Sequence, residues 1–320
     1  MKKKLDLVTI GESMVVLTST KQGYMRYNTH FERSFAGSEM NVAAGVSRMG
    51  HHSGWISRIG KDEFGKALKS FASSEGIDVS QVTEVSTNKT GLMFKEYIRE
   101  NKMKIAYYRD YSAASTIETK DIKEEYIKSA KYLFVSGITP LLSESCYEAV
   151  MKSISIAKKN NVKVIFDPNI RKNLWTFNES RSKFFEILKL SDIFLPGLIE
   201  AEILFNTRDV ETLADLILKE GPNLTVIKLG AEGAYYASSD ESNYVKGFKV
   251  ERIVDAVGAG DAFTAGLVTG LIEGLSLKES VVRANAFGAI VTQVKGDIEG
   301  IPTVDDLRHF LNDNDEDIER

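Results

Sequence analysis

The segment from Asp255 to Gly266 (DAVGAGDAFTAG) joins a turn of small residues to an apolar helix predicted from Ala262 to Glu273. Glycines in such a turn let backbone N–H groups converge on an anion at the helix start. A carboxylate at Asp261 would repel a bound phosphate, unless it accepts a proton from an attacking hydroxyl. The segment therefore favours phosphoryl transfer to a hydroxyl group, with Asp261 as the base. The alternative is that Asp261 only stabilises the helix dipole.

Other familiar motifs fail in this chain. The string from Gly60 to Lys66 (GKDEFGK) looks like a phosphate-binding loop but lacks the Ser or Thr that would bind Mg²⁺. A dinucleotide fingerprint at Gly258 has Phe263 where its third glycine should stand, which disfavours a dinucleotide-dependent oxidoreductase. The histidines have no metal-binding spacing, and no nucleophile elbow supports a serine hydrolase.

Strand-like and helix-like segments alternate along most of the chain, which predicts a mostly parallel sheet with helices on both faces. Two stretches, 15–35 and 90–114, interrupt this pattern, and the second contains a predicted hairpin that turns at Asn101 and Lys102. We expect them to pair into a small β lid, whereas residues 1–14, 36–89 and 115–320 form the core. In open parallel sheets, ligands bind beyond the carboxyl ends of the strands, so we expect the site there.

Composition limits the other possibilities. The chain has 320 residues, of which 43% are hydrophobic, and no apolar run approaches the roughly 20 residues of a membrane span. The N-terminus is interpreted as a first strand and not a signal peptide. The single cysteine, Cys146, excludes an intrachain disulfide, so a cytoplasmic location is expected. With a net charge of −4 and no basic aromatic stretch, nucleic acid is not an expected partner.

Four strings, in order along the chain, resemble the ribokinase-type (pfkB-type) carbohydrate kinases. They are Phe35–Ala43 (FAGSEMNVA), Arg58–Gly65 (RIGKDEFG), Val226–Gly233 (VIKLGAEG) and Asp255–Asp261 (DAVGAGD). The resemblance implies a ribokinase-like fold, with a Rossmann-like sheet, a β lid over the substrate, and ATP and Mg²⁺ as cofactors. It also implies that Asp261 is the catalytic base and that Gly258, Ala259 and Gly260 form an anion hole.

The resemblance places further residues near the nucleotide. Gly230 and Gly233 would lie beside it, and Lys228 would lie near its phosphates. Asn285 would line the adenine pocket, unless it is a helix surface residue. The family usually has Asn-x-x-Glu near the magnesium–phosphate site, but here Gly197 replaces the asparagine and Glu200 remains as an indirect metal contact.

Within this family, the chain looks most like the 2-keto-3-deoxygluconate kinases. The resemblance is carried by Asp167–Trp175 (DPNIRKNLW) and Tyr107–Ser115 (YYRDYSAAS). Arg109 and Arg171 would face the substrate, and a guanidinium suits a carboxylate. The alternative is that each arginine makes a structural ion pair. The other substrate-site candidates are Gly37, Asn41, Phe94 and Tyr107.

The same sequence features fit two other functions. A fructokinase or a ribokinase would share much of this frame, and a non-catalytic sugar-binding regulator would share the scaffold. We also expect a homo-oligomer, with Tyr24, Tyr27 or Phe31 of the lid packing against a second subunit.

Overall fold

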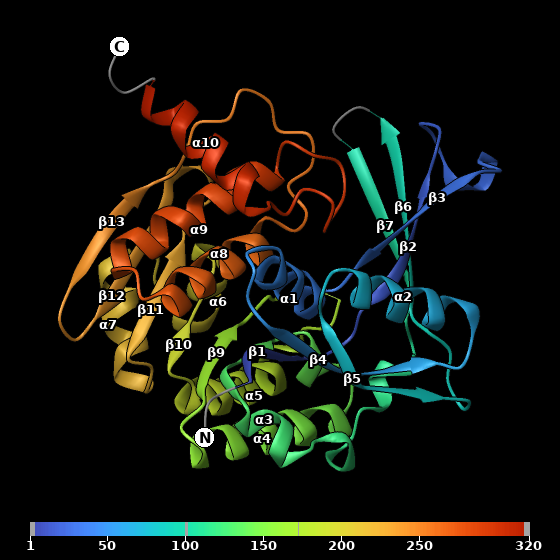
Figure 1. Cartoon of the computed structure of the whole chain (residues 1–320), viewed down its shortest axis with the longest axis horizontal. Coiled ribbons are helices and arrows are strands. Elements are labelled where there is room, and N and C mark those ends of the chain that lie inside the picture. Colours follow the sequence, from blue (N-terminus) through green and yellow to red (C-terminus); the bar gives the residue numbers. More distant parts are fainter. Residues whose placement is uncertain (1–3, 100–101, 172, 317–320) are drawn as a thin grey trace.

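The computed structural model describes residues 4–99, 102–171 and 173–316. Its main sheet has nine strands in the order β13-β12-β11-β10-β9-β8-β1-β4-β5 (Figure 1). All neighbouring strands from β11 to β5 pair in parallel. Strand β12 pairs antiparallel with β11, and β13 pairs antiparallel with β12. The strands are β1 Leu5–Ile10, β4 Ser53–Gly60, β5 Asp78–Val85, β8 Ala130–Ser136, β9 Lys163–Asp167, β10 Ile193–Phe194, β11 Leu224–Lys228, β12 Gly233–Ser238 and β13 Ser242–Lys246.

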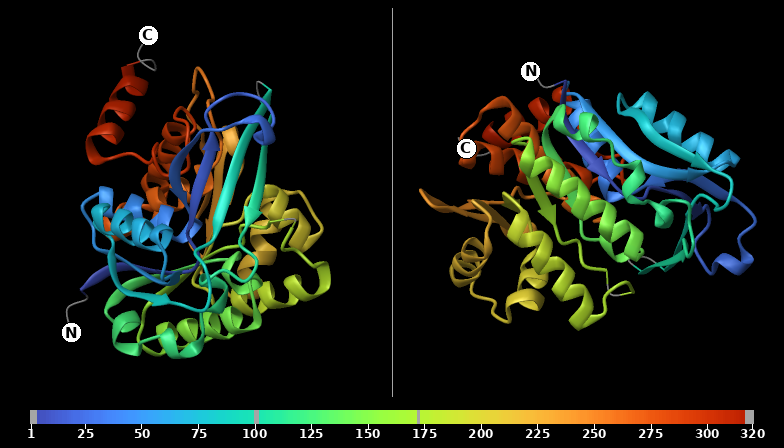
Figure 2. Two further views of the ribbon diagram at one scale, coloured as in Figure 1. Left: turned by 90° about the vertical axis from the view of Figure 1, so that its right-hand side faces the viewer. Right: turned by 90° about the horizontal axis from the view of Figure 1, so that it is seen from below.

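Helices cover both faces of this sheet, as the alternating pattern predicts (Figure 2). Buried residues of one face pack with α1 Ser38–Arg48, α2 Glu63–Ser74, α8 Ala259–Glu273, α9 Leu277–Val291 and α10 Val304–Glu316. Those of the other face pack with α3 Glu124–Lys128, α4 Glu144–Lys159, α5 Phe177–Leu190, α6 Leu198–Phe205 and α7 Val210–Glu220. The central strands are buried on both sides, so they are apolar almost throughout.

A second sheet of four strands, in the order β3-β2-β6-β7, projects from one end of the main sheet (Figure 1). Its strands are β2 Met14–Ser19, β3 Phe31–Ala36, β6 Leu92–Arg99 and β7 Lys102–Tyr108. The two stretches that break the βα pattern therefore pair as predicted. Of the predicted hairpin turn, Asn101 lies outside the described residues, whereas Lys102 begins β7. The division of the chain into core and lid residues stays a prediction.

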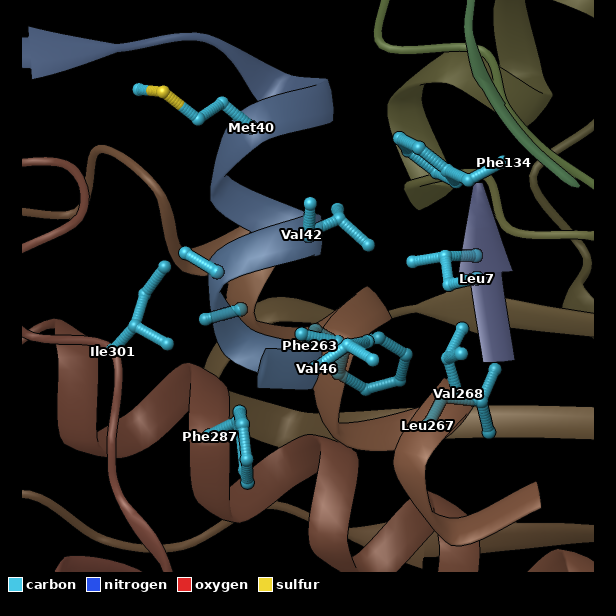
Figure 3. Close-up of a cluster of buried hydrophobic side chains, with 14 of the residues drawn as sticks. Leu7, Met40, Val42, Val46, Phe134, Phe263, Leu267, Val268, Phe287 and Ile301 are labelled. Atoms are coloured by element: carbon cyan, nitrogen blue, oxygen red, sulfur yellow. The ribbon is translucent and has the colours of Figure 1, made fainter. Parts of the chain in front are cut away.

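Helix α1 packs against α8 and thereby brings two distant motifs together. Figure 3 shows Val42 and Val46 of α1 beside Phe263 and Leu267 of α8, and all four are buried. Gly45 faces Ala265, and a Cβ at position 45 would lie 2.5 Å from the Ala265 methyl. The close approach of these helices places the start of α1 next to the start of α8.

Local sequence explains most helix ends. Asp62 caps α2 by accepting a hydrogen bond from the Gly65 N–H, and Ser143 caps α4 in the same way from Cys146. Helix α1 has no such cap: Gly37 precedes its first residue, Ser38, and the Ser38 hydroxyl donates a hydrogen bond to Asp261. Among the described residues, no helix has both the length and the apolar character required to cross a membrane.

Candidate active site

A cavity of about 1400 Å³ lies between the lid and the carboxyl ends of the main strands. It exceeds the volume of about 300–1,000 Å³ that usually holds one small ligand, so two substrates can fit together. Most of the predicted site residues line it: Gly37, Asn41, Tyr107, Arg109, Arg171, Glu200, Lys228, Gly230, Gly258, Gly260 and Asp261. Residues far apart in the sequence therefore converge on one space.

Asp261 lies in the first turn of α8 and is 8% exposed. The Ser38 hydroxyl donates to its Oδ1 at 2.6 Å, and the Asn41 amide donates to its Oδ2 at 2.8 Å. Burial raises the pKa of this carboxyl, and the two hydrogen bonds oppose the rise. The result is a fixed carboxylate that faces the cavity and is more basic than an exposed aspartate, as a general base requires.

The turn before Asp261 has the conformation of an anion site. Gly258 has φ +83°, and a Cβ there would lie 2.4 Å from the Asp297 carbonyl oxygen, so only glycine fits. Helix α8 begins at Ala259, and its first N–H groups lack partners within the helix. The Ala259 N–H makes only a long 3.4 Å hydrogen bond to the Ala256 carbonyl. Gly258 and Gly260 line the cavity, so a phosphoryl group could meet this helix start.

Lys228, at the end of β11, supplies a cation to the same cavity. Its Nζ lies 2.7 Å from Asp167 Oδ2, which also accepts a hydrogen bond from Thr264 at 3.2 Å. Burial opposes the charge on Lys228, but the carboxylates of Asp167 and Glu200 outweigh it and raise the pKa of the ammonium. Lys228 is therefore held charged beside the Gly260 turn.

Glu200 lies on the same side of the cavity and caps α6. Its Oε1 accepts from the Ile170 N–H at 2.8 Å, and its Oε2 accepts from the Gly197 N–H at 2.7 Å. Burial raises its pKa, whereas the nearby Lys228 lowers it. Both carboxylate oxygens thus have backbone partners.

The two candidate arginines have different environments. Arg109 is buried and pairs with the fully buried carboxylate of Glu12, which also accepts from Ser112. Arg109 thus makes the structural ion pair that was the alternative, although it also lines the cavity beside Tyr107. Its buried Nε has no hydrogen-bond partner.

Arg171 is exposed at the cavity and has no side-chain partner among the described residues. It follows Asn169, which has φ +39° and whose amide donates to the Ser38 hydroxyl at 3.0 Å. Arg171 is close enough to Asp261 to lower the pKa of that carboxyl. Its guanidinium is therefore available to a ligand held next to Asp261.

Four predicted residues do not line the cavity. Phe94 lies on the other face of the lid sheet, against Phe31 and Tyr108. Ala259 begins α8 between two glycines that do face the cavity, and Gly233 packs against the Val245 carbonyl. Asn285 is buried and joins α9 to β13, because its amide donates to the carbonyls of Val245 and Lys246. It is therefore not a helix surface residue.

Comparison with known proteins shows the family of this chain. Residues 4–304 match the family described as "pfkB family carbohydrate kinase". The chain belongs to this family. It is a carbohydrate kinase with a ribokinase-like fold.

Individual pfkB relatives are similar over nearly their whole length. A "2-dehydro-3-deoxygluconokinase" of Bacillus subtilis (strain 168) is 38% identical over 311 residues, which cover 97% of this chain and 96% of the relative. A "5-dehydro-2-deoxygluconokinase" of Clostridium beijerinckii is 31% identical over 98% of this chain and 95% of the relative. A putative Ribokinase II from E. coli, solved in complex with ATP and Mg²⁺, has a TM-score of 0.89 at 26% identity and covers 97% of this chain and 99% of that chain.

The residues of this pfkB kinase fit a magnesium ion that is held mainly by phosphates and water. Among the described residues, no group of three His, Cys, Asp or Glu side chains could hold a metal by itself. Mg²⁺ commonly keeps several waters and binds through one or two carboxylates plus substrate phosphates. Glu200 and Asp167 are the carboxylates at that end of the cavity.

Sequence reasoning missed several residues that build this kinase site. Ser38 and Asn169 lie inside strings that were singled out, but no role for their side chains followed from those strings. Glu12 and Glu39 carry no local signal beyond being acidic in apolar surroundings, and both are buried. Their positions depend on contacts with distant segments.

Proposed function

We propose that this pfkB kinase transfers the γ-phosphoryl group of ATP to a hydroxyl of 2-keto-3-deoxygluconate, which is also named 2-dehydro-3-deoxygluconate. The observation that carries the proposal is the Arg171 guanidinium, which has no partner in the described part of the chain and lines the same cavity as Asp261. The 38% identity to a 2-dehydro-3-deoxygluconokinase supports the substrate. The product would be the phosphorylated sugar acid and ADP.

In this mechanism Asp261 takes the proton of the attacking hydroxyl, while Ser38 and Asn41 hold both carboxylate oxygens in place. The N–H groups of Gly258, Ala259 and Gly260 stabilise the charge on the transferring phosphoryl group. Lys228 adds a positive charge on the phosphate side. Mg²⁺, bound with the nucleotide near Glu200, would neutralise charge on its phosphates. The lid excludes water, which would otherwise compete as the acceptor.

A sugar acid fits the substrate end better than a neutral sugar does. A neutral ketose would leave Arg171 facing the ligand without a charged partner, whereas a carboxylate can accept two hydrogen bonds from one guanidinium. Arg109 is less available to a substrate carboxylate, because its Nη2 already pairs with Glu12. We therefore assign carboxylate recognition first to Arg171, with Gly37, Asn41 and Tyr107 contacting the rest of the sugar.

The test is kcat/KM for 2-keto-3-deoxygluconate, 5-keto-2-deoxygluconate, fructose and ribose. Hydrogen bonds to charged groups contribute about 1.5–3 kcal/mol, and about 1.4 kcal/mol is tenfold. The sugar acid should therefore be preferred over fructose by at least about tenfold. Arg171→Ala should lose most of this preference, and Arg171→Lys should restore only part of it. The matched control is Arg308→Ala, which removes an exposed arginine of α10.

Each failure of this test has a distinct meaning. A wild type that prefers fructose or ribose would replace the proposal with a neutral-sugar kinase. A preference for 5-keto-2-deoxygluconate would keep the acid but change its identity. If Arg171→Ala retains the full preference, then Arg109 or another residue of the cavity binds the carboxylate. Binding of sugar without any ATP turnover would support a non-catalytic regulator instead.

We also propose that a second copy of the chain covers the outer face of the lid. Tyr24, Tyr27 and Tyr108 are 47%, 77% and 62% exposed there, and large aromatic side chains are enriched in protein interfaces. Sedimentation velocity should give a homo-oligomer for the wild type. A purely monomeric protein at working concentration would remove this part of the proposal.

A further inference from the structure

A buried ion pair links the lid to the core beneath the cavity. Lys95 on β6 is 2% exposed and pairs with Asp297, which is 5% exposed and lies between α9 and α10. Removing two charges from water is costly, and a buried pair often stabilises a fold no better than apolar residues would. Such a pair does, however, restrict the relative positions of the two segments that carry its charges. Here it connects the lid strand to the segment that supports α8.

The backbone of Asp297 rests directly on the anion-binding turn. A Cβ on Gly258 would lie 2.4 Å from the Asp297 carbonyl oxygen and 3.2 Å from its carbonyl carbon. No side chain separates the two backbones, so a shift of Asp297 must change the position of Gly258. Asp297 and Gly258 also line the same cavity. A displacement of the lid strand can therefore reach the helix start through one side chain and one backbone contact.

Besides joining the lid to Asp297, the charge of Lys95 affects the electrostatics around the Gly258 turn. Burial raises the pKa of Asp297, Lys95 lowers it, and the neighbouring carboxylates of Asp255 and Asp261 raise it further. Asp255 accepts a hydrogen bond from the Val257 N–H at 3.0 Å, inside the same turn. Lys95 thus places a buried positive charge among three acids that would otherwise repel an incoming phosphoryl group.

We propose that Lys95 is a positioning residue that couples the lid to the anion-binding turn. A sugar that draws the lid over the cavity also sets Asp297 and Gly258 in the position that receives the phosphoryl group. The inference rests on the roles proposed above for the lid and for Gly258. Coupling between two binding sites is reciprocal and commonly amounts to about 5- to 150-fold in affinity. Bound sugar should therefore tighten nucleotide binding, and nucleotide should tighten sugar binding.

The experiment measures the dissociation constant of a non-hydrolysable ATP analogue by calorimetry, with and without the saturating sugar that the wild type phosphorylates. Wild type should bind the analogue at least about fivefold tighter with sugar. Lys95→Met should reduce this factor to within about twofold of unity. It should also lower kcat by about tenfold or more while changing the sugar KM much less. Lys95→Arg, which keeps the charge, should retain part of the coupling.

Lys295→Met is the matched control. Lys295 also bridges the same segment to the lid, 3.6 Å from Glu32 on β3, but both side chains are exposed. This variant should keep the wild-type coupling, because an exposed pair imposes little geometry. If it loses as much coupling as Lys95→Met, the buried pair has no special role and the proposal fails.

Two further results would overturn the proposal: no coupling in the wild type, or unchanged coupling in Lys95→Met. If Lys95→Met does not fold, because Asp297 is left as an unpaired buried charge, the double variant Lys95→Met/Asp297→Leu removes both charges. It should fold and lack the coupling, and wild-type coupling in it would refute the inference. Normal turnover in Asp261→Asn would refute the proposed base without affecting this test.

Discussion

The Glu39→Gln variant should lack a pH dependence of stability that the wild type shows between about pH 5 and pH 8. Glu39 lies in the first turn of α1 and is 1% exposed. Its Oε1 accepts a hydrogen bond from the Thr139 hydroxyl at 2.5 Å, and a Cβ on Gly11 would lie 2.1 Å from the same oxygen. Burial, opposed mainly by this hydrogen bond, raises the pKa of Glu39 to about 8.

The size of the stability effect follows from the pKa shift of Glu39. The pKa rises from 4.5 to about 8, and one pKa unit corresponds to about 1.4 kcal/mol, so the full effect is about 5 kcal/mol. The folded state holds the proton more tightly than the unfolded state does. The stabilisation is therefore fully present below pH 4.5 and is lost as the pH rises through about 8.

The assay is urea denaturation at a series of pH values from about 5 to 9, with the free energy of unfolding extrapolated to water. From about pH 5 to pH 8, wild type should weaken relative to Glu39→Gln by about 1.4 kcal/mol per pH unit, and above about pH 8 the difference should level off. Glutamine keeps the shape of the side chain but cannot ionise. Other buried acids titrate in both proteins, so their contributions cancel in the difference.

Glu279→Gln is the control for this experiment. Glu279 is an exposed cap of α9 whose pKa is lowered by hydrogen bonds from Ser276. Its contribution is present above its unfolded pKa and is lost only in acid, so its difference from wild type should stay constant over the same window. A constant difference for Glu39→Gln as well would show that Glu39 is ionised in the folded protein and would refute the reasoning.

Three further predictions concern the active site. Asp261→Asn should lower kcat by roughly 10²–10⁴-fold while ATP binding, measured by calorimetry, persists; in wild type, kcat should fall as the pH drops through the raised pKa of Asp261. Gly258→Ala should lose both thermal stability and turnover because its methyl group meets the Asp297 carbonyl, whereas Gly230→Ala has open space and should lose only about 1–2 kcal/mol in urea denaturation for its φ of +65°. Gly197→Asn should fold, because φ is −75°, and its amide oxygen should lower the Mg²⁺ concentration that gives half-maximal velocity.

The sequence alone was sufficient to identify the fold class and the reaction. Alternating strand and helix periods are local properties of the chain, so the parallel sheet and the two interrupting stretches could be predicted from them. The turn before Asp261 was equally readable, because a glycine-rich helix start next to a carboxylate has few other uses. The order of the four family strings then indicated a carbohydrate kinase, which the family match confirmed.

Only the tertiary structure decided which side chains face the cavity. Alternation along β6 indicates that Phe94 and Glu96 share a face, but not whether that face covers the cavity. The register of the lid places Met93 and Tyr97 on the cavity wall instead. A period of two defines two faces equally well, and packing against the core selects between them.

The ion pairs and hydrogen bonds of the site were likewise beyond the sequence. Ser38 and Asp261 are 223 positions apart, and Lys95 and Asp297 are 202 apart. Arg109 and Arg171 were both candidates for the substrate site, yet one is paired with Glu12 and the other is free among the described residues. The type of a side chain determines which partners it can accept, whereas burial and the folded path of the chain determine which partner it meets.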